Sequence, residues 1–246
     1  MLIEQPPTLF RRLYPGALWR LDPEEKAVYL TFDDGPCPEV TPWVLEQLRR
    51  VDARATFFVV GDNVRKYPDT FRQMLAEGHR VGNHTFNHIK GFSRRYFTSS
   101  AYLENTEAAH RIMLATAPPE GLAASPAPDL AEASAAPMPP SVAPREQTRR
   151  AIEPLLFRPP HGHMGWGQYF ALKKRYQIVM WDVVTRDYSR RLRPPQVLAN
   201  VMRYTRNGSI ITFHDSLKAW QGGNLPYALP RALDFLKEEG YAFRTL

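Results

Sequence analysis

The sequence contains a single cysteine, Cys37, so an intrachain disulfide and a cysteine-rich zinc site are both excluded. No stretch approaches the roughly 18 uninterrupted apolar residues that a transmembrane helix requires, so no membrane span is expected. The opening residues MLIEQPPTLFRR lack an apolar run after a basic start. We therefore expect no ordinary secretory signal and a cytoplasmic location.

Proline is unevenly distributed along the 246 residues. Eight of the 23 prolines and nine alanines fall within residues 116–148, where no aromatic residue and no apolar periodicity occur. Such a segment buries too little apolar surface to offset the entropy cost of ordering it. We therefore predict one catalytic domain over residues 1–246 with a Pro/Ala-rich mobile insertion inside it. The net charge of +7 becomes about +10 without this acidic insertion.

Outside the insertion, β-branched and aromatic runs alternate with helical patterns, which predicts an α/β fold with about seven parallel strands. Periodicity alone does not distinguish a barrel from an open doubly wound sheet. Strands are expected at residues 26–32, 54–60, 79–84, 154–160, 177–183, 208–213 and 241–246. Helices are expected at residues 41–50, 67–77, 99–114, 169–176, 195–204 and 229–239.

Two carboxylates follow the first predicted strand directly. In YLTFDDGP, Asp33 and Asp34 come after an apolar run and before the turn-forming pair Gly35-Pro36. Adjacent carboxylates at the end of a strand are costly unless a cation or hydrogen-bond donors satisfy them. The carboxyl edge of a parallel sheet is also where functional sites form. A turn that caps a helix is the alternative interpretation of an isolated DDG.

Two histidines follow the third predicted strand. In HTFNH, His84 and His88 have the i, i+4 spacing that places two imidazoles on one side of a helical turn, a usual spacing of zinc ligands. With one carboxylate of the Asp pair they form a three-ligand set with open positions, which suits a catalytic metal. The same donors occur in non-haem iron oxygenases, so the donors alone do not identify the reaction.

The carboxylate of the Asp33-Asp34 pair that does not bind the metal indicates hydrolysis, because it is placed to take a proton from a water on the metal. The metal can lower the pKa of that water from about 15.7 to roughly 7. FRPPHGH adds Arg158 and a turn whose backbone N–H can face an oxyanion. ITFHDS places His214 at a strand end as a candidate general acid. Asp182 and Asp187 follow another strand, and either is able to orient the imidazole of His214.

These motifs together resemble the polysaccharide deacetylase family (carbohydrate esterase family 4), metal-dependent enzymes that remove acetyl groups from amino-sugar polymers. The resemblance rests on TFDDGP, HTFNH, RPPHG, WDVVTRDY and ITFHD, and it runs from about residue 26 to the C-terminus outside the insertion. It implies a distorted (β/α) barrel with about seven strands. It also implies a divalent metal, usually Zn²⁺, although the ligand set accepts Co²⁺ or Ni²⁺ as well.

The resemblance also implies a role for each motif residue. The metal ligands would be Asp34, His84 and His88. The catalytic residues would be Asp33 as general base, Arg158 to orient it, His214 as general acid and Asp187 to hold that imidazole. The oxyanion and substrate contacts would come from the backbone N–H of His161 and from Tyr188, Thr212 and Trp181.

Three positions depart from the commoner family pattern. His161 stands where a tyrosine is usual, Tyr188 replaces a tryptophan, and Thr212 replaces a leucine of the acetyl pocket. The expected substrate is an N-acetylated glycan or glycoconjugate. The alternatives are a metal-dependent amidohydrolase of a small amide or imide, and a non-enzymatic binder of an anionic polymer. No nucleic-acid-binding module is recognised, so nucleic acid is not expected as a partner.

Overall fold

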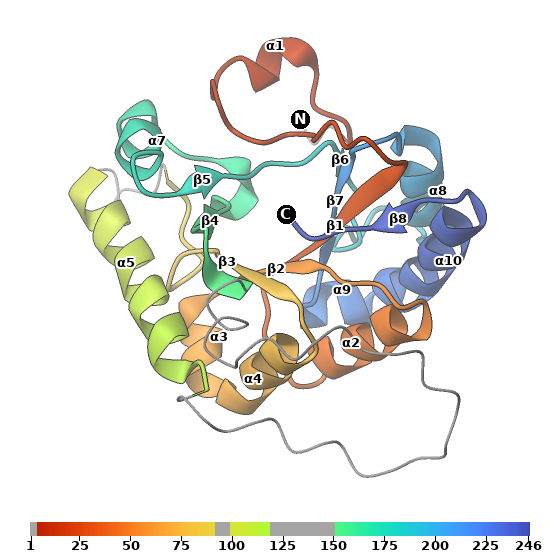
Figure 1. Ribbon diagram of the computed structural model, residues 1–246, viewed down its shortest axis with the longest axis horizontal. Helices are drawn as coiled ribbons and strands as arrows, with labels where there is room; N and C mark the ends of the chain where they lie inside the picture. The colour runs from red at the N-terminus through yellow and green to blue at the C-terminus, as the bar shows by residue number, and fades with distance from the viewer. Residues whose placement is uncertain (1–3, 92–98, 119–150) are drawn as a thin grey trace.

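The computed structural model describes residues 4–91, 99–118 and 151–246. Its eight-stranded sheet is curled, with helices on its outer side (Figure 1). The order is β5-β4-β3-β2-β1-β7-β6, β8 also pairs with β1, and every strand pairing is parallel. The strands are β1 (Ala27–Asp33), β2 (Thr56–Val59), β3 (Arg80–Asn83), β4 (Leu156–Phe157), β5 (Gln177–Ile178), β6 (Val183–Val184), β7 (Ile210–His214) and β8 (Ala242–Phe243). The predicted distorted barrel of parallel strands is confirmed.

The helices occupy most of the expected ranges. They are α1 (Thr8–Arg11), α2 (Thr41–Arg50), α3 (Gly61–Lys66), α4 (Pro68–Ala76), α5 (Ser99–Thr116), η2 (Pro160–Gly162), α7 (Trp166–Leu172), α8 (Pro194–Tyr204), α9 (Leu217–Gln221) and α10 (Asn224–Glu238). The short helices α1, α3 and α9 were not predicted, because four to six residues are too few to show a periodicity. Helix α7 begins and ends earlier than predicted, and α10 begins earlier and contains Pro230.

The predicted strand over residues 177–183 is wrong in one respect, because it is interrupted and forms β5 and β6. The intervening backbone pairs with the N-terminal segment: Leu18 N–H donates to the Ile178 carbonyl at 2.8 Å, and Met180 N–H donates to the Leu18 carbonyl at 2.7 Å. Farther along, Leu21 N–H donates to the Gly208 carbonyl at 3.0 Å. The N-terminal segment therefore lies between the β5 side and the β7 side of the sheet.

The interior of the sheet is built around β1, in which all seven residues are buried. The ring of Phe32 stacks on Phe57 of β2 and on Phe213 of β7, with centroids 5.0 and 5.9 Å apart. This packing holds three neighbouring strands rigidly beside one another, so their carboxyl ends form a fixed edge.

The first residue of the predicted insertion, Thr116, is the last residue of α5. Residues 119–148 of that prediction lie outside the described part of the chain. Among the described helices, none is long and apolar enough to cross a membrane.

Candidate active site

Strand register brings the distant motifs to one edge of the sheet. Asp33 of β1 pairs with His214 of β7, and Asn83 of β3 pairs with Phe157 of β4. His84 and Arg158 directly follow those last two residues. The sequence prediction that these side chains gather at the carboxyl edge of a parallel sheet agrees with this arrangement.

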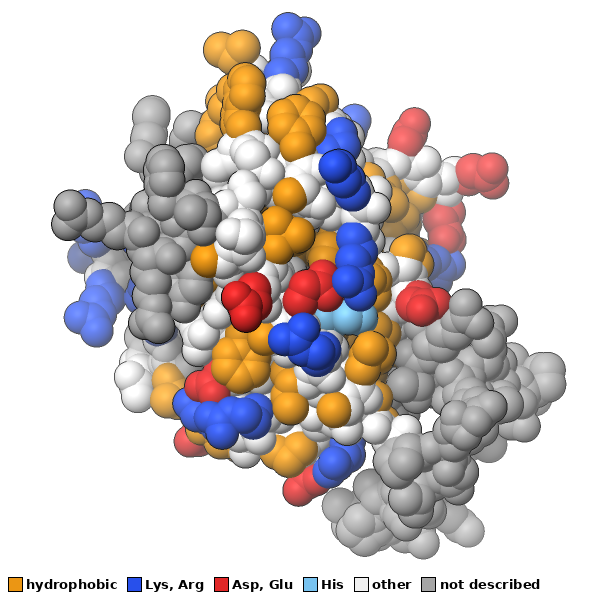
Figure 2. Space-filling model, turned by 90° about the vertical axis from the view of Figure 1, so that its left-hand side faces the viewer, with side chains coloured by type: hydrophobic (Ala, Val, Ile, Leu, Met, Phe, Trp, Pro, Cys, Tyr) orange, Lys and Arg blue, Asp and Glu red, His pale blue; other side chains and the backbone are white. Residues whose placement is uncertain are grey.

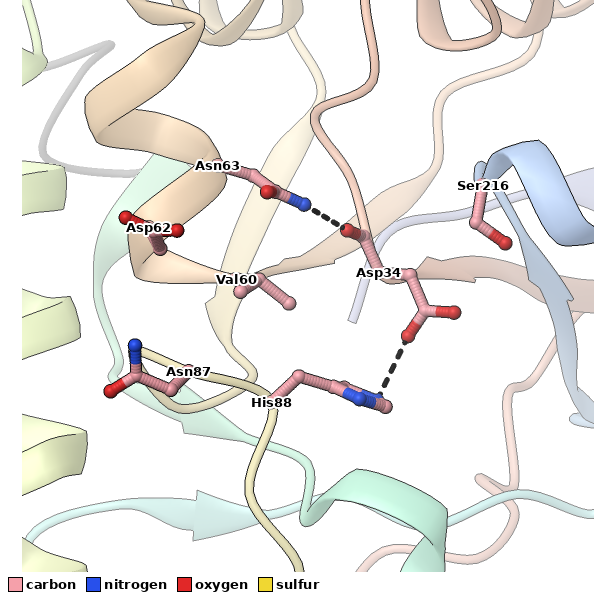
Figure 3. Close-up of a pocket in the computed structure, with 7 residues that line it drawn as sticks. All are labelled: Asp34, Val60, Asp62, Asn63, Asn87, His88 and Ser216. Atoms are coloured by element: carbon pink, nitrogen blue, oxygen red, sulfur yellow. Dashed lines mark hydrogen bonds and ion pairs between the residues drawn. The ribbon is translucent and has the colours of Figure 1, made fainter.

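Three potential metal-ligand atoms lie within 4.8 Å of one another, on Asp34, His84 and His88. The Asp34 carboxylate is 3.8 Å from His84 Nε2. It is 3.1 Å from His88 Nε2, a contact drawn as a dashed line in Figure 3. The expected helical turn between the histidines is wrong, because no helix forms there. Left-handed backbone at Thr85 (φ 64°) and His88 (φ 52°) brings the imidazoles together instead.

The protonation of this cluster fits a divalent cation. His84 Nδ1 lies 2.8 Å from the Arg158 carbonyl, and only a protonated Nδ1 can donate to that oxygen. Burial lowers the pKa of His84 to about 4, so the imidazole is neutral and Nε2 carries a free lone pair. Burial raises the pKa of Asp34, but the hydrogen bond from His88 and the positive charge of the nearby His214 lower it, and the net pKa is lowered. Two imidazoles and a carboxylate are donors typical of zinc sites.

Asp33 is held by a fully buried arginine. Arg158 Nη1 donates to Asp33 Oδ1 at 2.7 Å and to the Thr31 hydroxyl at 2.8 Å. Arg158 Nη2 donates to the Met180 carbonyl at 2.7 Å, and the guanidinium lies 4.1 Å from the centroid of the Phe58 ring. Since Asp33 uses Oδ1 for this pair, Oδ2 is not engaged by the arginine.

His214 is held by Asp187, which resolves the ambiguity between the two candidate carboxylates. Asp187 accepts one hydrogen bond from the His214 backbone N–H and one from Nδ1, both at 2.8 Å. Burial lowers the pKa of His214, but the Asp187 charge and hydrogen bond outweigh it and raise the pKa to about 9. Asp182 instead accepts from Arg11, Arg206 and Ser209, so it has no part in orienting this imidazole.

The predicted oxyanion turn lies against the metal-ligand cluster. The His161 ring is 4.8 Å from the His88 ring, and His161 has left-handed backbone with φ 60°. Trp181 packs on the next residue, since a Cβ built on Gly162 would lie 2.3 Å from its ring. The Trp181 indole nitrogen is buried without a hydrogen-bond partner.

The other two predicted substrate residues are Tyr188, which contacts His214, and Thr212, which lies two residues before His214 on β7. The Tyr188 ring meets the His214 ring edge-on at 4.7 Å. The Thr212 hydroxyl lies 3.1 Å from the Thr31 hydroxyl, which also contacts Arg158. Thr212 is therefore linked through Thr31 to the guanidinium that holds Asp33.

Asp215 was not among the predicted site residues, although it stands in the ITFHD motif. Asp215 is fully buried and accepts from Gly35 N–H at 3.0 Å and from the Thr41 hydroxyl at 2.7 Å. Its own N–H donates to the Asp33 carbonyl at 3.1 Å. Asp215 directly follows His214, the candidate general acid at the end of a predicted strand, and this position could have indicated a role in the site.

A pocket of about 370 Å³ opens beside the metal-ligand cluster (Figure 3). Asn63 on its wall donates from Nδ2 to the Asp34 carbonyl at 2.7 Å, which fixes the turn after β1. The lining residues are Asp34, Val60, Asp62, Asn63, Asn87, His88 and Ser216. The pocket is therefore predominantly polar, and one end of it is formed by two of the potential metal ligands.

Acidic and basic side chains are interspersed over the face shown in Figure 2. Several basic side chains lie in a broken row down the middle of this face, with acidic and hydrophobic side chains between and beside them.

Comparisons with known proteins agree with the arrangement of the motifs. The family model described as Polysaccharide deacetylase matches residues 20–126. A peptidoglycan-N-acetylglucosamine deacetylase of Bacillus cereus is 31% identical over 237 residues, covering 93% of this chain and 90% of that protein. A chitooligosaccharide deacetylase of Azorhizobium caulinodans is 48% identical over 73 residues, covering 30% of this chain and 35% of that protein.

The similarity extends to the whole fold. The crystal structure of a peptidoglycan N-acetylglucosamine deacetylase in complex with 4-naphthalen-1-yl-N-oxidanyl-benzamide superposes with a TM-score of 0.73 and 26% identity. The superposition covers 98% of this chain and 95% of that one. With the ordered motifs at the carboxyl edge of the sheet, these matches show that the chain belongs to the polysaccharide deacetylase family, carbohydrate esterase family 4.

Proposed function

We propose that the protein is a metal-dependent hydrolase that removes acetyl groups from the N-acetylated amino sugars of a glycan, such as peptidoglycan or a chitooligosaccharide. The substrate class follows from what the similar proteins act on. The observation that carries the proposal is the position of two ion pairs at the edge of the sheet that also carries the metal-ligand cluster. In one pair Arg158 holds Asp33, and in the other Asp187 holds His214.

Asp34, His84 and His88 would hold the divalent ion, for which we propose Zn²⁺, with Co²⁺ and Ni²⁺ as ions that the same donors accept. When bound, such an ion acts as a Lewis acid toward the acetyl carbonyl and lowers the pKa of water. The neutral His84 supports this role, because its Nδ1 proton is committed to the Arg158 carbonyl and Nε2 is left for the ion.

Asp33 would act as the general base. Arg158 orients the carboxylate through Oδ1, which leaves Oδ2 to take a proton from the attacking water. The water oxygen then forms a bond to the acetyl carbon, and the carbonyl oxygen gains negative charge. The backbone N–H of His161, in the turn beside His88, would stabilise that charge.

His214 would act as the general acid. With a pKa raised to about 9, the imidazole is protonated at neutral pH, and Asp187 fixes its orientation through both of its oxygens. The imidazolium gives its proton to the sugar nitrogen as the C–N bond breaks, so acetate and a free amine are the products. General acid–base catalysis of this kind contributes about 10²- to 10⁴-fold in rate.

The test is release of acetate from N-acetylglucosamine oligomers, peptidoglycan fragments and small amides, before and after removal of metal with a chelator. We expect activity on the acetylated glycans, its loss on chelation and its return with Zn²⁺. Activity on the small amides alone would overturn the substrate class, and activity resistant to chelation in metal-free protein would overturn the metal dependence.

Two histidine variants test the ligand assignment. His84→Ala should lose bound zinc on elemental analysis. His79→Ala provides the matched control, because His79 is equally buried but accepts a hydrogen bond from Ala55 N–H and lies outside the metal-ligand cluster. Equal zinc content in wild type and His84→Ala would contradict the assignment.

A further inference from the structure

We propose that Glu4, in the N-terminal segment, is a positioning residue for the general acid His214, acting through Arg186 and Asp187. The proposal rests on the proposed function, in which His214 protonates the departing amine. It assigns a catalytic purpose to a segment that none of the motifs includes.

Glu4 contacts the loop before Asp187 in two ways. Its backbone carbonyl accepts a hydrogen bond from Val184 N–H at 2.9 Å, which anchors the segment to β6. Its carboxylate pairs with Arg186 Nη1 at 2.5 Å. The exposed fractions of the two side chains are only 25% and 16%, so this ion pair is less screened than one on the open surface.

Arg186 has an unfavourable backbone conformation, which the ion pair with Glu4 helps to hold. Its φ is +63°, in the left-handed region, which is unfavourable for a residue with a side chain. The flanking residues are anchored elsewhere: the Thr185 hydroxyl donates to the Thr212 carbonyl at 2.9 Å, and Asn224 Nδ2 donates to the Asp187 carbonyl at 3.0 Å. Among the described residues, Arg186 itself forms its ion pair with Glu4.

Asp187, the residue after Arg186, contacts the general acid His214. Asp187 is completely buried, and its two oxygens accept from the backbone N–H and from Nδ1 of His214. Two hydrogen bonds of 2.8 Å fix the carboxylate and the imidazole as one unit. A change of backbone conformation at Arg186 therefore moves the plane of the Asp187 carboxylate and, with it, the imidazole.

The metal-ligand residues lie on other elements than Glu4 and Arg186. They follow β1 and β3, whereas Glu4 contacts β6 and the loop after it. Loss of the Glu4 carboxylate should therefore disturb proton donation and leave metal binding intact. This separation distinguishes a positioning role from a general contribution to folding.

The first experiment compares Glu4→Ala with Glu25→Ala. Glu25 also pairs with an arginine, Arg244, at 2.6 Å, but both side chains are half exposed and the pair lies outside the site. For an N-acetylated sugar we expect Glu4→Ala to lower kcat about tenfold, part of the 10²- to 10⁴-fold that a general acid supplies, with unchanged KM and zinc content. Glu25→Ala should match wild type.

The second comparison uses a substrate whose leaving group departs without protonation, 4-nitrophenyl acetate. Glu4→Ala should hydrolyse this ester at the wild-type rate, because the general acid is not required. An equal loss on the amide and the ester would overturn the proposal, since it would indicate damage to the whole site. Unchanged amide turnover in Glu4→Ala would overturn it as well.

A double-variant cycle tests the connection through Arg186. Glycine adopts a positive φ without penalty, so Arg186→Gly removes both the strain and the ion pair. We expect Glu4→Ala to have no further effect on kcat in the Arg186→Gly background. A further tenfold loss there would overturn the proposed route.

Amide hydrogen exchange separates this proposal from the proposed function. We expect faster exchange of residues 185–188 in Glu4→Ala than in wild type or Glu25→Ala, and no such difference between Arg186→Gly and the double variant. If wild type releases no acetate from any substrate, the proposed function fails, and the exchange result then decides whether Glu4 positions this loop. Unchanged exchange in Glu4→Ala would overturn the positioning role.

Discussion

Gly35 and Asp215 are in such close contact that no side chain fits at residue 35. Gly35 N–H donates to Asp215 Oδ1 at 3.0 Å, and a Cβ built on Gly35 would lie 2.0 Å from Asp215 Oδ2. The same carboxylate accepts from the Thr41 hydroxyl, so it connects the turn after β1 to the start of α2. This turn carries Asp33 and Asp34, and its shape therefore depends on a glycine with a buried carboxylate beside it.

Gly35→Ala should consequently weaken metal binding. The methyl group must displace the Asp215 carboxylate or the turn, and loss of outer contacts that orient ligands typically costs 10- to 100-fold in metal affinity. Competition for Zn²⁺ with a chromophoric chelator measures the change. Gly222→Ala serves as the control, because the nearest atom to its added Cβ is 3.8 Å away. Equal zinc affinities of the two variants would contradict the role of the contact.

Asp33→Asn should separate metal binding from hydrolysis. The amide keeps the size of the carboxylate but does not accept a proton from water, whereas Asp34, His84 and His88 are left in place. We expect wild-type zinc content and a fall in kcat of about 10²- to 10⁴-fold. Full turnover in a zinc-loaded Asp33→Asn variant would refute the general-base assignment.

The alkaline limb of the pH–rate profile should follow the loss of the proton from His214. The acid must be protonated, so activity should fall as the pH rises through about 9. Its neighbouring carboxylates are Asp187, Asp34 and Asp33. Asp187→Asn should move the limb toward the unperturbed histidine pKa of about 6.5, because it removes the adjacent charge.

The pair of His214 and Asp187 should make the free energy of unfolding depend on pH. A histidine pKa that is raised in the folded state adds stability that is fully present below about pH 6.5, and this contribution is lost as the pH rises through about 9. Denaturant unfolding from pH 6 to pH 10 measures it. A stability difference between wild type and Asp187→Asn that stays constant over this range would contradict the assigned shift.

Arg158→Met should destabilise the protein strongly. The variant leaves the buried Asp33 carboxylate without its cation, and breaking a buried ion pair typically costs about 3–5 kcal/mol in the free energy of unfolding. Arg244→Met breaks an exposed pair with Glu25 and should cost about 0–1 kcal/mol. Chemical denaturation measures the free energy of unfolding of both variants. Equal losses of stability would show that the pair of Asp33 and Arg158 contributes no more than an exposed pair.

Much of the candidate site was predictable from local sequence. Asp33, Asp34 and His214 follow short apolar runs directly, and the carboxyl ends of parallel strands meet at one edge whatever the details of packing. The interruption between β5 and β6 was not predictable, because residues 177–183 read as one apolar run. Their hydrogen bonds to Leu18 come from a part of the chain with no strand pattern of its own.

The sequence by itself determined the alternation of strands and helices and the chemical groups at the strand ends, since both depend on residues close together in the chain. The residues alone left Asp182 and Asp187 open as partners of His214, the family resemblance implied Asp187, and the tertiary structure gives Asp187 both hydrogen bonds to His214. Only the tertiary structure placed Asp215 against Gly35 and Glu4 against Arg186, pairs that are 180 and 182 residues apart in sequence. Such contacts depend on strand register and on how the N-terminal segment packs, and these are properties of the whole folded chain.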